Sequence, residues 1–235
     1  MAAKHLKNAL TAVDWNFNAK TFLTDDELVE RVATANLRIA VWAKQLEAAD
    51  AGNAALSFIR EMQAAGHLVA ACLALALYKA AAGSIRGMLE NALYYTFFRS
   101  HPKELITLTR NAKYFVDKNE ILDFHRTHTA GFIEAQQQLS LIGDVESWYS
   151  HVSSIVHGQV PGVWHNQIDL AKTAHSKEVL ATAVELFCRG ELLVHRLFLC
   201  TVSQELWDYF SQTAKSQLLA GLDGKLKALL KIENQ

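Results

Sequence analysis

The stretch AAGHLVAACLALALYKAAAGSIRGMLENALYYTFFRS, residues 64–100, decides the fold because it is apolar almost all the way round a helix. A helix without a polar face is buried on every side, and the many alanines here let neighbouring helices approach closely. We therefore expect residues 54–100 to lie at the centre of a bundle, as one long helix or as two helices divided near Gly83. The most apolar run, Leu68–Tyr78, is well short of the ~20 residues that a membrane-spanning helix needs, so no membrane association is expected.

The rest of the chain carries helical signals. Both prolines, Pro102 and Pro161, end helical patterns, and no sustained alternation or hairpin signal predicts a strand. A helix is expected after an N-cap at Thr24, and another from about Ser176 to Thr213. An apolar stripe at helical spacing marks the core face of the first of these: Leu28, Val32, Ala35, Ile39, Trp42 and Leu46. The predicted fold is all-α, a helical bundle with a long central Ala-rich helix.

No linker or repeat divides the chain, so residues 1–213 are predicted to form a single α-helical domain. Residues 214–235, which contain SQLLAGLDGKLKALLKIE, have an amphipathic pattern. An amphipathic helix can lay its apolar face into a groove of another protein. We therefore interpret residues 214–235 as a C-terminal helical tail and a candidate docking element.

Composition limits the classes of function. The formal net charge is −1 and the pI is about 6.8, so no global positive field attracts nucleic acid and any RNA site must be local. The three cysteines are far apart, without a CxxC pair, and the N-terminus has no apolar leader. These features are typical of reduced core thiols in a cytoplasmic protein. Glycine-rich phosphate loops, HExxH, GxSxG and dinucleotide fingerprints are absent, so we expect no cofactor and no metal.

The segment YSHVSSIVHGQVPG, residues 149–162, is the strongest site candidate. It is predicted to end a helix that Asp144 caps and Gly158 stops. His151, Ser154 and His157 recur at steps of three, and two imidazoles beside a hydroxyl could serve as general acid and base. The alternative is an ordinary helix end, with an imidazole near the negative end of the dipole and Ser154 bonded back to a carbonyl.

A second candidate is the charged pair in SIRGMLENALYY, where Arg86 and Glu90 lie four residues apart on a strongly apolar helix. Charges in such surroundings need partners. Glu90 could orient Arg86 toward an anionic substrate or phosphate, with Asn91 and Tyr95 adding polar groups nearby. The alternative is a structural ion pair that fixes helix packing.

The segment DFHRTHTAGF places His125 and His128 at helical spacing. His-x-x-His can bind a metal, but no Cys or carboxylate stands at a recognised ligand spacing around it. We interpret this pair as part of a solvated helix face.

The combination of SIRGMLENALYYTFFRSHP and the later YSHVSSIVHG resembles the HEPN superfamily, whose divergent members occur in bacterial defence and toxin systems. The likeness lies in an Arg-x-x-x-Glu helix followed by a helix that ends in a Ser-x-x-x-His type motif, and it covers roughly residues 54–162. The resemblance implies an α-helical bundle. Family members that cut RNA resemble one another in an Arg that is followed a few residues later by a His, and they work without metal at a dimer interface.

By this resemblance His157 matches the family histidine. The upstream position that should be Arg holds His151 instead, and Arg86 of the other helix could supply the missing cation. The implied activity is metal-independent RNA cleavage, with His157 and His151 as acid and base, Arg86 stabilising the phosphorane, Ser154 positioning the phosphate and Glu90 holding Arg86.

Two other functions remain open at the level of sequence. The protein could be a non-catalytic helical interaction or accessory subunit, with the Ala-rich helix as an oligomer interface. It could also sense a small ligand in a cavity between helices, where polar groups converge in an apolar bundle. The expected partners are a second copy of the chain or another protein; RNA is compatible with the site but is not indicated by the net charge.

Overall fold

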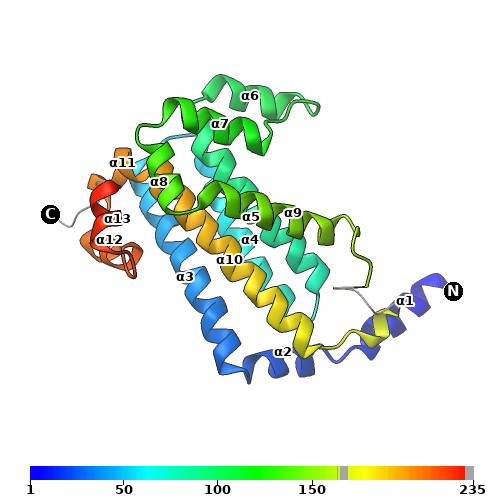
Figure 1. The fold of residues 1–235 in the computed structure, drawn as a ribbon. Coiled ribbons are helices and arrows are strands. Elements are labelled where there is room, and N and C mark those ends of the chain that lie inside the picture. The colour runs from blue at the N-terminus through cyan, green and yellow to red at the C-terminus, as the bar shows by residue number, and fades with distance from the viewer. Residues whose placement is uncertain (163, 165–168, 231–235) are drawn as a thin grey trace.

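The protein is described by a computed structural model that covers residues 1–162, 164 and 169–230. Every secondary-structure element in these ranges is a helix, which confirms the predicted all-α class (Figure 1). In chain order they are α1 (Ala2–Ala12), α2 (Trp15–Leu23), α3 (Asp26–Ala49), α4 (Leu56–Ala74), α5 (Tyr78–Phe98), α6 (Pro102–Arg110), α7 (Lys118–His128), α8 (Phe132–Gln138), α9 (Leu141–Val156), the 3-10 turn η1 (Leu170–Lys172), α10 (Lys177–Thr201), α11 (Ser203–Leu206), the 3-10 turn η2 (Trp207–Tyr209), α12 (Gln212–Leu218) and α13 (Gly224–Leu229). None of the helices in the described ranges combines the length and the apolar character needed to cross a bilayer.

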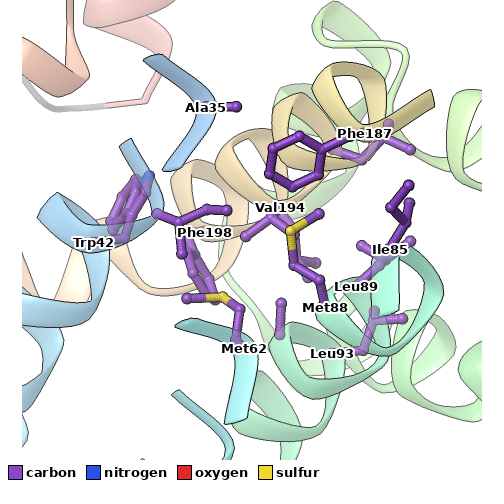
Figure 2. Packing of buried hydrophobic residues seen from close by; sticks show 14 of the residues in the cluster. Ala35, Trp42, Met62, Ile85, Met88, Leu89, Leu93, Phe187, Val194 and Phe198 are labelled. Carbon is purple, nitrogen blue, oxygen red and sulfur yellow. The ribbon is translucent and has the colours of Figure 1, made fainter. Parts of the chain in front are cut away.

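Four helices, α3, α4, α5 and α10, make up the body of the bundle, and α9 packs against both α5 and α10 (Figure 1). Between them lies a core in which Trp42 of α3 packs on Phe198 of α10 with ring centroids 5.2 Å apart (Figure 2). Met62 of α4 and Met88 of α5 are fully buried in the same core. All six residues of the stripe predicted for α3 are buried, which confirms the orientation of that helix.

Residues 54–100 contain two helices, and the break between them does not lie near Gly83, where the two-helix alternative placed it. Helix α4 ends at Ala74 and α5 begins at Tyr78, so the apolar run Leu68–Tyr78 crosses the break and does not form one helix. Ala76 has a left-handed backbone with φ of 59°. The N–H of Leu77 donates to the Cys72 carbonyl at 2.8 Å, the bond of a Schellman helix end. Because alanine stands where glycine is usual, no local signal marked this end.

Two other boundaries differ from those predicted. Asp25, not Thr24, is the N-cap of α3, and its carboxylate accepts from the N–H of Leu28. Helix α10 ends at Thr201 rather than Thr213. No glycine or proline marks that end in the sequence.

Helix α9 begins earlier than predicted and ends where predicted. Its N-cap is Ser140, and Asp144 lies inside the first turn, where its carboxylate pairs with Arg196 at 2.7 Å. At the other end Gly158 has φ of 69°, and its N–H donates to the Ile155 carbonyl at 3.2 Å. The glycine stop leaves His157 as the C-cap residue of α9.

In the described residues, the C-terminal tail packs against the helical bundle of the same chain. Helix α12 packs against α3, and α13 against α8. The side chains of Leu218, Leu219 and Leu230 are buried. A partner that docks on this tail would therefore meet its exposed face and not these leucines.

Candidate functional site

The site is centred on a contact between α5 and α9. Arg86 faces α9 near the middle of α5, and Nη1 of Arg86 lies 2.8 Å from Nε2 of His157. An arginine can only donate, so in this contact Nε2 of the imidazole is the acceptor. The sequence-predicted Arg86 and His157 are thus direct neighbours.

Glu90 and Tyr149 hold the guanidinium from its other side. Nε of Arg86 donates to Oε1 of Glu90 at 3.0 Å, and Nη2 donates to the Tyr149 hydroxyl at 2.8 Å. The same hydroxyl donates to Oε1 of Glu90 at 2.6 Å. Arg86, Glu90 and Tyr149 therefore form a closed triangle of hydrogen bonds that leaves the guanidinium little freedom to rotate.

Sequence reasoning missed Tyr149, although its spacing carried a signal. Tyr149 and His157 are eight residues apart, a little over two helical turns, so both side chains lie on the face of α9 that meets α5. Ser153 falls between them at steps of four, whereas the predicted Ser154 is one position round the helix. A search for side chains in register with His157 would have selected Tyr149.

The site holds a fixed cation, Arg86, whose charge Glu90 partly balances. Burial alone would lower the pKa of Arg86, but Glu90 and the Tyr149 hydroxyl outweigh it and raise that pKa above its ordinary value. Burial, together with the hydrogen bond to Glu90, raises the pKa of Tyr149 to about 12, so this hydroxyl is neutral at pH 7. Two lysines stand nearby: Nζ of Lys79 lies 3.7 Å from where a Cβ on Gly158 would be, and Nζ of Lys118 lies 5.6 Å from the centre of the Tyr149 ring.

A cavity of about 270 Å³ opens beside the triangle, between α5, the N-terminus of α7 and α9. Arg86, Glu90, Tyr149, Phe115 and Lys118 are among the residues that line it. His157 contacts Arg86 but does not line this cavity. Arg86 therefore joins two places, the imidazole at the end of α9 and the cavity along α5.

The other predicted site residues do not join this cluster. His151 is exposed on α9, and the Ser154 hydroxyl donates to the His151 carbonyl at 2.7 Å, the back-bond that was the alternative interpretation of this serine. Asn91 is half-buried on α5 and does not line the cavity. Tyr95 belongs to a different group, because its hydroxyl donates to Oδ2 of Asp50 at 2.8 Å.

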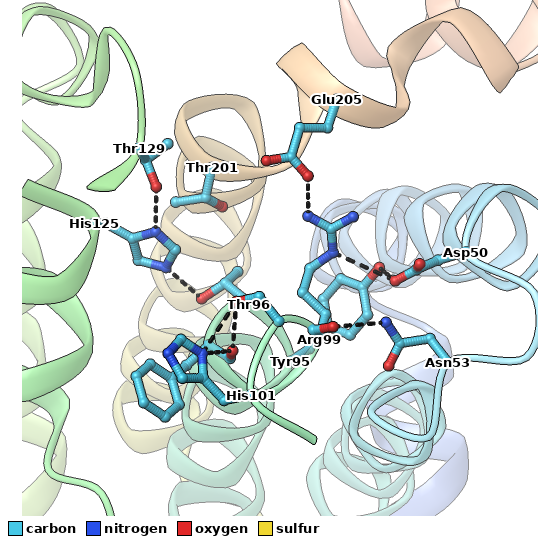
Figure 3. Close-up of polar contacts among 12 residues, drawn as sticks. Asp50, Asn53, Tyr95, Thr96, Arg99, His101, His125, Thr129, Thr201 and Glu205 are labelled. Atoms are coloured by element: carbon cyan, nitrogen blue, oxygen red, sulfur yellow. Dashed lines mark hydrogen bonds and ion pairs between the residues drawn. The ribbon is translucent and has the colours of Figure 1, made fainter. Parts of the chain in front are cut away.

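The polar cluster that contains Tyr95 and Asp50 lies at the C-terminal end of α5, and it links α5 to neighbouring parts of the chain (Figure 3). Arg99 bonds to Asp50 at 3.3 Å and to Glu205 at 2.5 Å, and its carbonyl accepts from Asn53 at 3.0 Å. Besides the Tyr95 bond, these contacts tie α5 to the α3–α4 connection and to α11. They leave Tyr95 with a structural role.

The interpretation of His125 as part of a solvated face is wrong. Its side chain is buried between α7 and α5, with Nε2 2.9 Å from the Thr96 hydroxyl and Nδ1 2.8 Å from the Thr129 hydroxyl (Figure 3). His128 is exposed as expected. Within the described ranges, no group of three or more His, Cys, Asp or Glu side chains is arranged to hold a metal ion.

Comparisons with family models, with curated proteins and with solved structures find no match to this chain. The resemblance to the HEPN superfamily therefore stays a prediction from the two motifs.

Proposed function

We propose that the protein is a HEPN-like, metal-independent endoribonuclease whose reaction takes place at the Arg86–His157 contact. The observation that carries the proposal is the 2.8 Å distance between Nη1 of Arg86 and Nε2 of His157, with Arg86 held by Glu90 and Tyr149. A guanidinium stabilises negative charge on a phosphate, and an imidazole nitrogen removes a proton once its electron pair is released from the Arg86 hydrogen bond.

The reaction is an internal transfer of the phosphodiester. When the phosphate binds, Nη1 of Arg86 transfers its hydrogen bond from Nε2 of His157 to a phosphate oxygen. Nε2 then accepts the proton of a ribose 2′-hydroxyl, the 2′ oxygen forms a bond to phosphorus, and the bond from phosphorus to the 5′ oxygen breaks. Arg86 stabilises the charge on the phosphorane oxygens. The 5′ oxygen takes its proton from water, because His151, the predicted general acid, is exposed on α9 and does not join the Arg86–His157 cluster. The products are a 2′,3′-cyclic phosphate and a 5′-hydroxyl end, and no oxidant or metal enters the balance.

The setting follows from the resemblance alone. HEPN-like nucleases suggest a bacterial defence or toxin-type system in the cytoplasm, and a homodimer or a protein partner that completes the site. The chain's net charge of −1 is consistent with a small local site and not with a broad RNA-binding surface.

The test is cleavage of a mixed set of RNA oligonucleotides by the full-length chain in EDTA. We expect His157→Ala and Arg86→Ala each to slow cleavage by about a hundredfold or more, because general base catalysis and charge stabilisation each contribute at least that much. His67→Ala, which removes an exposed histidine on α4, is the matched control and should retain the wild-type rate. Circular dichroism checks that each variant is folded.

Two results would count against the proposal. Cleavage by His157→Ala at the wild-type rate would place the reaction elsewhere. A wild-type protein that cleaves no RNA would favour a non-catalytic protein, either an accessory subunit or a small-ligand sensor. The cavity of about 270 Å³ beside Arg86 favours the sensor as the second candidate.

A further inference from the structure

The cavity beside Arg86 is lined by three aromatic side chains, of which Phe115 and Tyr94 have no part in the proposed reaction. Phe115 precedes α7, and its side chain is 71% exposed at the cavity. Tyr94 and Tyr149 line the same cavity and are half-buried. A lone exposed phenylalanine needs no explanation, but one that lines a cavity with two tyrosines and a guanidinium is a platform on which a planar ring can stack.

Two carboxylates line the cavity and keep acceptor capacity. Each hydrogen bond and ion pair recorded for Glu90 uses Oε1, which leaves Oε2 to accept from a ligand. Asp117 caps α7: its side chain accepts from the N–H of Asn119 at 2.7 Å and from the N–H of Glu120 in a capping box. A carboxylate has about four acceptor positions, so further ones remain for a ligand. Carboxylates accept hydrogen bonds from exocyclic amino groups such as N4 of cytosine. The carboxylates of Glu90 and Asp117 therefore suit a planar ligand that donates hydrogen bonds.

Two cations line the cavity and could pair with a phosphate. Arg86 lines the cavity and contacts His157, and Lys118 lines the cavity with its ammonium over the Tyr149 ring. An aromatic platform, carboxylate acceptors and two cations match the three parts of a nucleotide that stack, donate and carry negative charge. The volume of about 270 Å³ is slightly below the ~300–1,000 Å³ of pockets for drug-sized ligands, so it suits one nucleotide.

We propose that this cavity binds the base of the nucleotide next to the scissile phosphate, and that it favours a base with an exocyclic amino group (cytosine, adenine or guanine) over uracil. The statement that this nucleotide flanks a scissile bond rests on the proposed function. The binding of the base does not, because the platform and the acceptors are present whether or not the phosphodiester is cut.

The test is calorimetric binding of 3′-CMP, 3′-AMP, 3′-UMP and inorganic phosphate to the full-length chain. We expect 3′-CMP and 3′-AMP to bind at least about tenfold more tightly than 3′-UMP and phosphate. Phe115→Ala should weaken 3′-CMP binding by about tenfold, a typical loss for a removed stacking partner, and should leave phosphate binding unchanged. Phe17→Ala is the matched control, because Phe17 is 63% exposed on α2 and does not line the cavity.

A second variant tests base selectivity. Asp117→Asn keeps a residue type that caps helices well and replaces a pure acceptor by a group that also donates. We expect it to narrow the difference in affinity between 3′-CMP and 3′-UMP, and to leave the melting temperature close to that of the wild type.

These measurements distinguish the proposal of a base-binding cavity from the proposal of a ribonuclease. A 3′-CMP affinity no higher than that of phosphate, or an equal effect of Phe115→Ala and Phe17→Ala, would overturn the base site even if RNA is cleaved. Equal binding of 3′-CMP and 3′-UMP would overturn its selectivity. Selective 3′-CMP binding without cleavage of any RNA would keep the base site and reject the ribonuclease.

Discussion

The guanidinium of Arg86 and the imidazole of His157 lie 2.8 Å apart, although 71 positions separate the two residues in the chain. The contact exists because α5 and α9 pack together and because the glycine stop after α9 leaves His157 at the helix end. Nε2 of His157 must accept in this pair, so its electron pair can remove a proton from a substrate only after Arg86 moves its hydrogen bond to the substrate. The pair therefore links α5 to the end of α9, and it also brings together two groups that can act on a phosphodiester.

Tyr149→Phe tests how much the site depends on its hydroxyl. The substitution removes one donor to Glu90 and one acceptor for Arg86 but keeps the ring. We expect a loss of about 1 kcal/mol in the free energy of unfolding, together with slower RNA cleavage because Arg86 is less firmly held. Urea unfolding and cleavage rates measure the two effects. Tyr209→Phe, at a side chain that is 72% exposed, should change neither; a Tyr149→Phe variant that also changes neither would deny the hydroxyl its positioning role.

Stability should fall as the pH falls below about 6.5, because of buried histidines. Burial, with the nearby charges of Arg99 and His101, lowers the pKa of His125 to about 4. The unfolded chain, with a histidine pKa of about 6.5, binds more protons than the folded chain between these values, so acid favours unfolding there. For His125 alone the loss is about 2 kcal/mol between pH 7 and pH 5. His195, whose pKa burial lowers to about 3, acts in the same direction.

The measurement is the free energy of unfolding in urea at pH 7 and at pH 5, for the wild type and for His125→Gln. Glutamine does not titrate, so the variant should lose less stability on acidification even if it is less stable at pH 7. His5→Gln, at an exposed position on α1, should keep the wild-type pH dependence. Equal pH dependence of all three proteins would show that His125 is protonated in the folded chain as easily as in the unfolded chain.

Much of the fold followed from patterns that are local in sequence. The all-α class, the buried stripe of α3 and the glycine stop after α9 each depend on residues within a few turns of one another. The end of α4 did not follow, because Ala76 takes a left-handed backbone for which alanine gives no signal. There the packing of two helices outweighs the intrinsic preference of the residue.

The sequence predicted which charged residues belong to the candidate site, but it did not predict how Tyr149 contacts them. The Arg86–Glu90 contact follows from a spacing of four on a helix. The contacts of Tyr149 depend on residues 59 and 63 positions away, which no local pattern relates. His125 was misjudged for a related reason: the polar residues around it predict solvent, whereas the two hydroxyls that satisfy its ring come from α5 and from the residue that follows α7.

The ion pair between the half-buried Arg38 of α3 and the buried Glu191 of α10 should contribute more to stability than a surface pair. Nε of Arg38 donates to Oε1 of Glu191 at 2.6 Å, and Glu191 is 2% exposed. Arg38→Met would leave a carboxylate buried without its partner, at a cost of about 3–5 kcal/mol. Arg38→Met combined with Glu191→Leu should recover a large part of that loss, because the double variant buries no charge.

Thermal unfolding of the single and double variants checks this. Arg60→Ala, which removes the exposed partner of Glu47, is the control and should have little effect, as is usual for surface pairs. A double variant as unstable as Arg38→Met alone would mean that packing of the arginine stem, and not the uncompensated charge, carries the cost.

Gly190 and Gly143 form a matched pair that tests the contact between α9 and α10. Both are helical glycines, but a Cβ on Gly190 would overlap the indole ring of Trp148, whereas a Cβ on Gly143 meets nothing within 4 Å. The indole is fully buried, and its Nε1 donates to the Leu186 carbonyl at 3.0 Å, so it cannot move aside without losing that bond. Gly190→Ala should therefore be strongly destabilising, by about 2 kcal/mol or more, because overpacking a core costs that much.

Gly143→Ala should have the opposite sign. Alanine restricts the unfolded chain more than glycine does and favours the helix, so the variant should gain about 0.5–1 kcal/mol. Urea unfolding of both variants measures the difference. A Gly190→Ala variant as stable as Gly143→Ala would show that the added Cβ does not collide with the indole ring of Trp148. Helices α9 and α10 would then not be in close contact at this point. The packing of α9 on α10 and α5 sets the positions of Tyr149 and His157. With looser packing on α10, these two side chains would be held less firmly against Arg86.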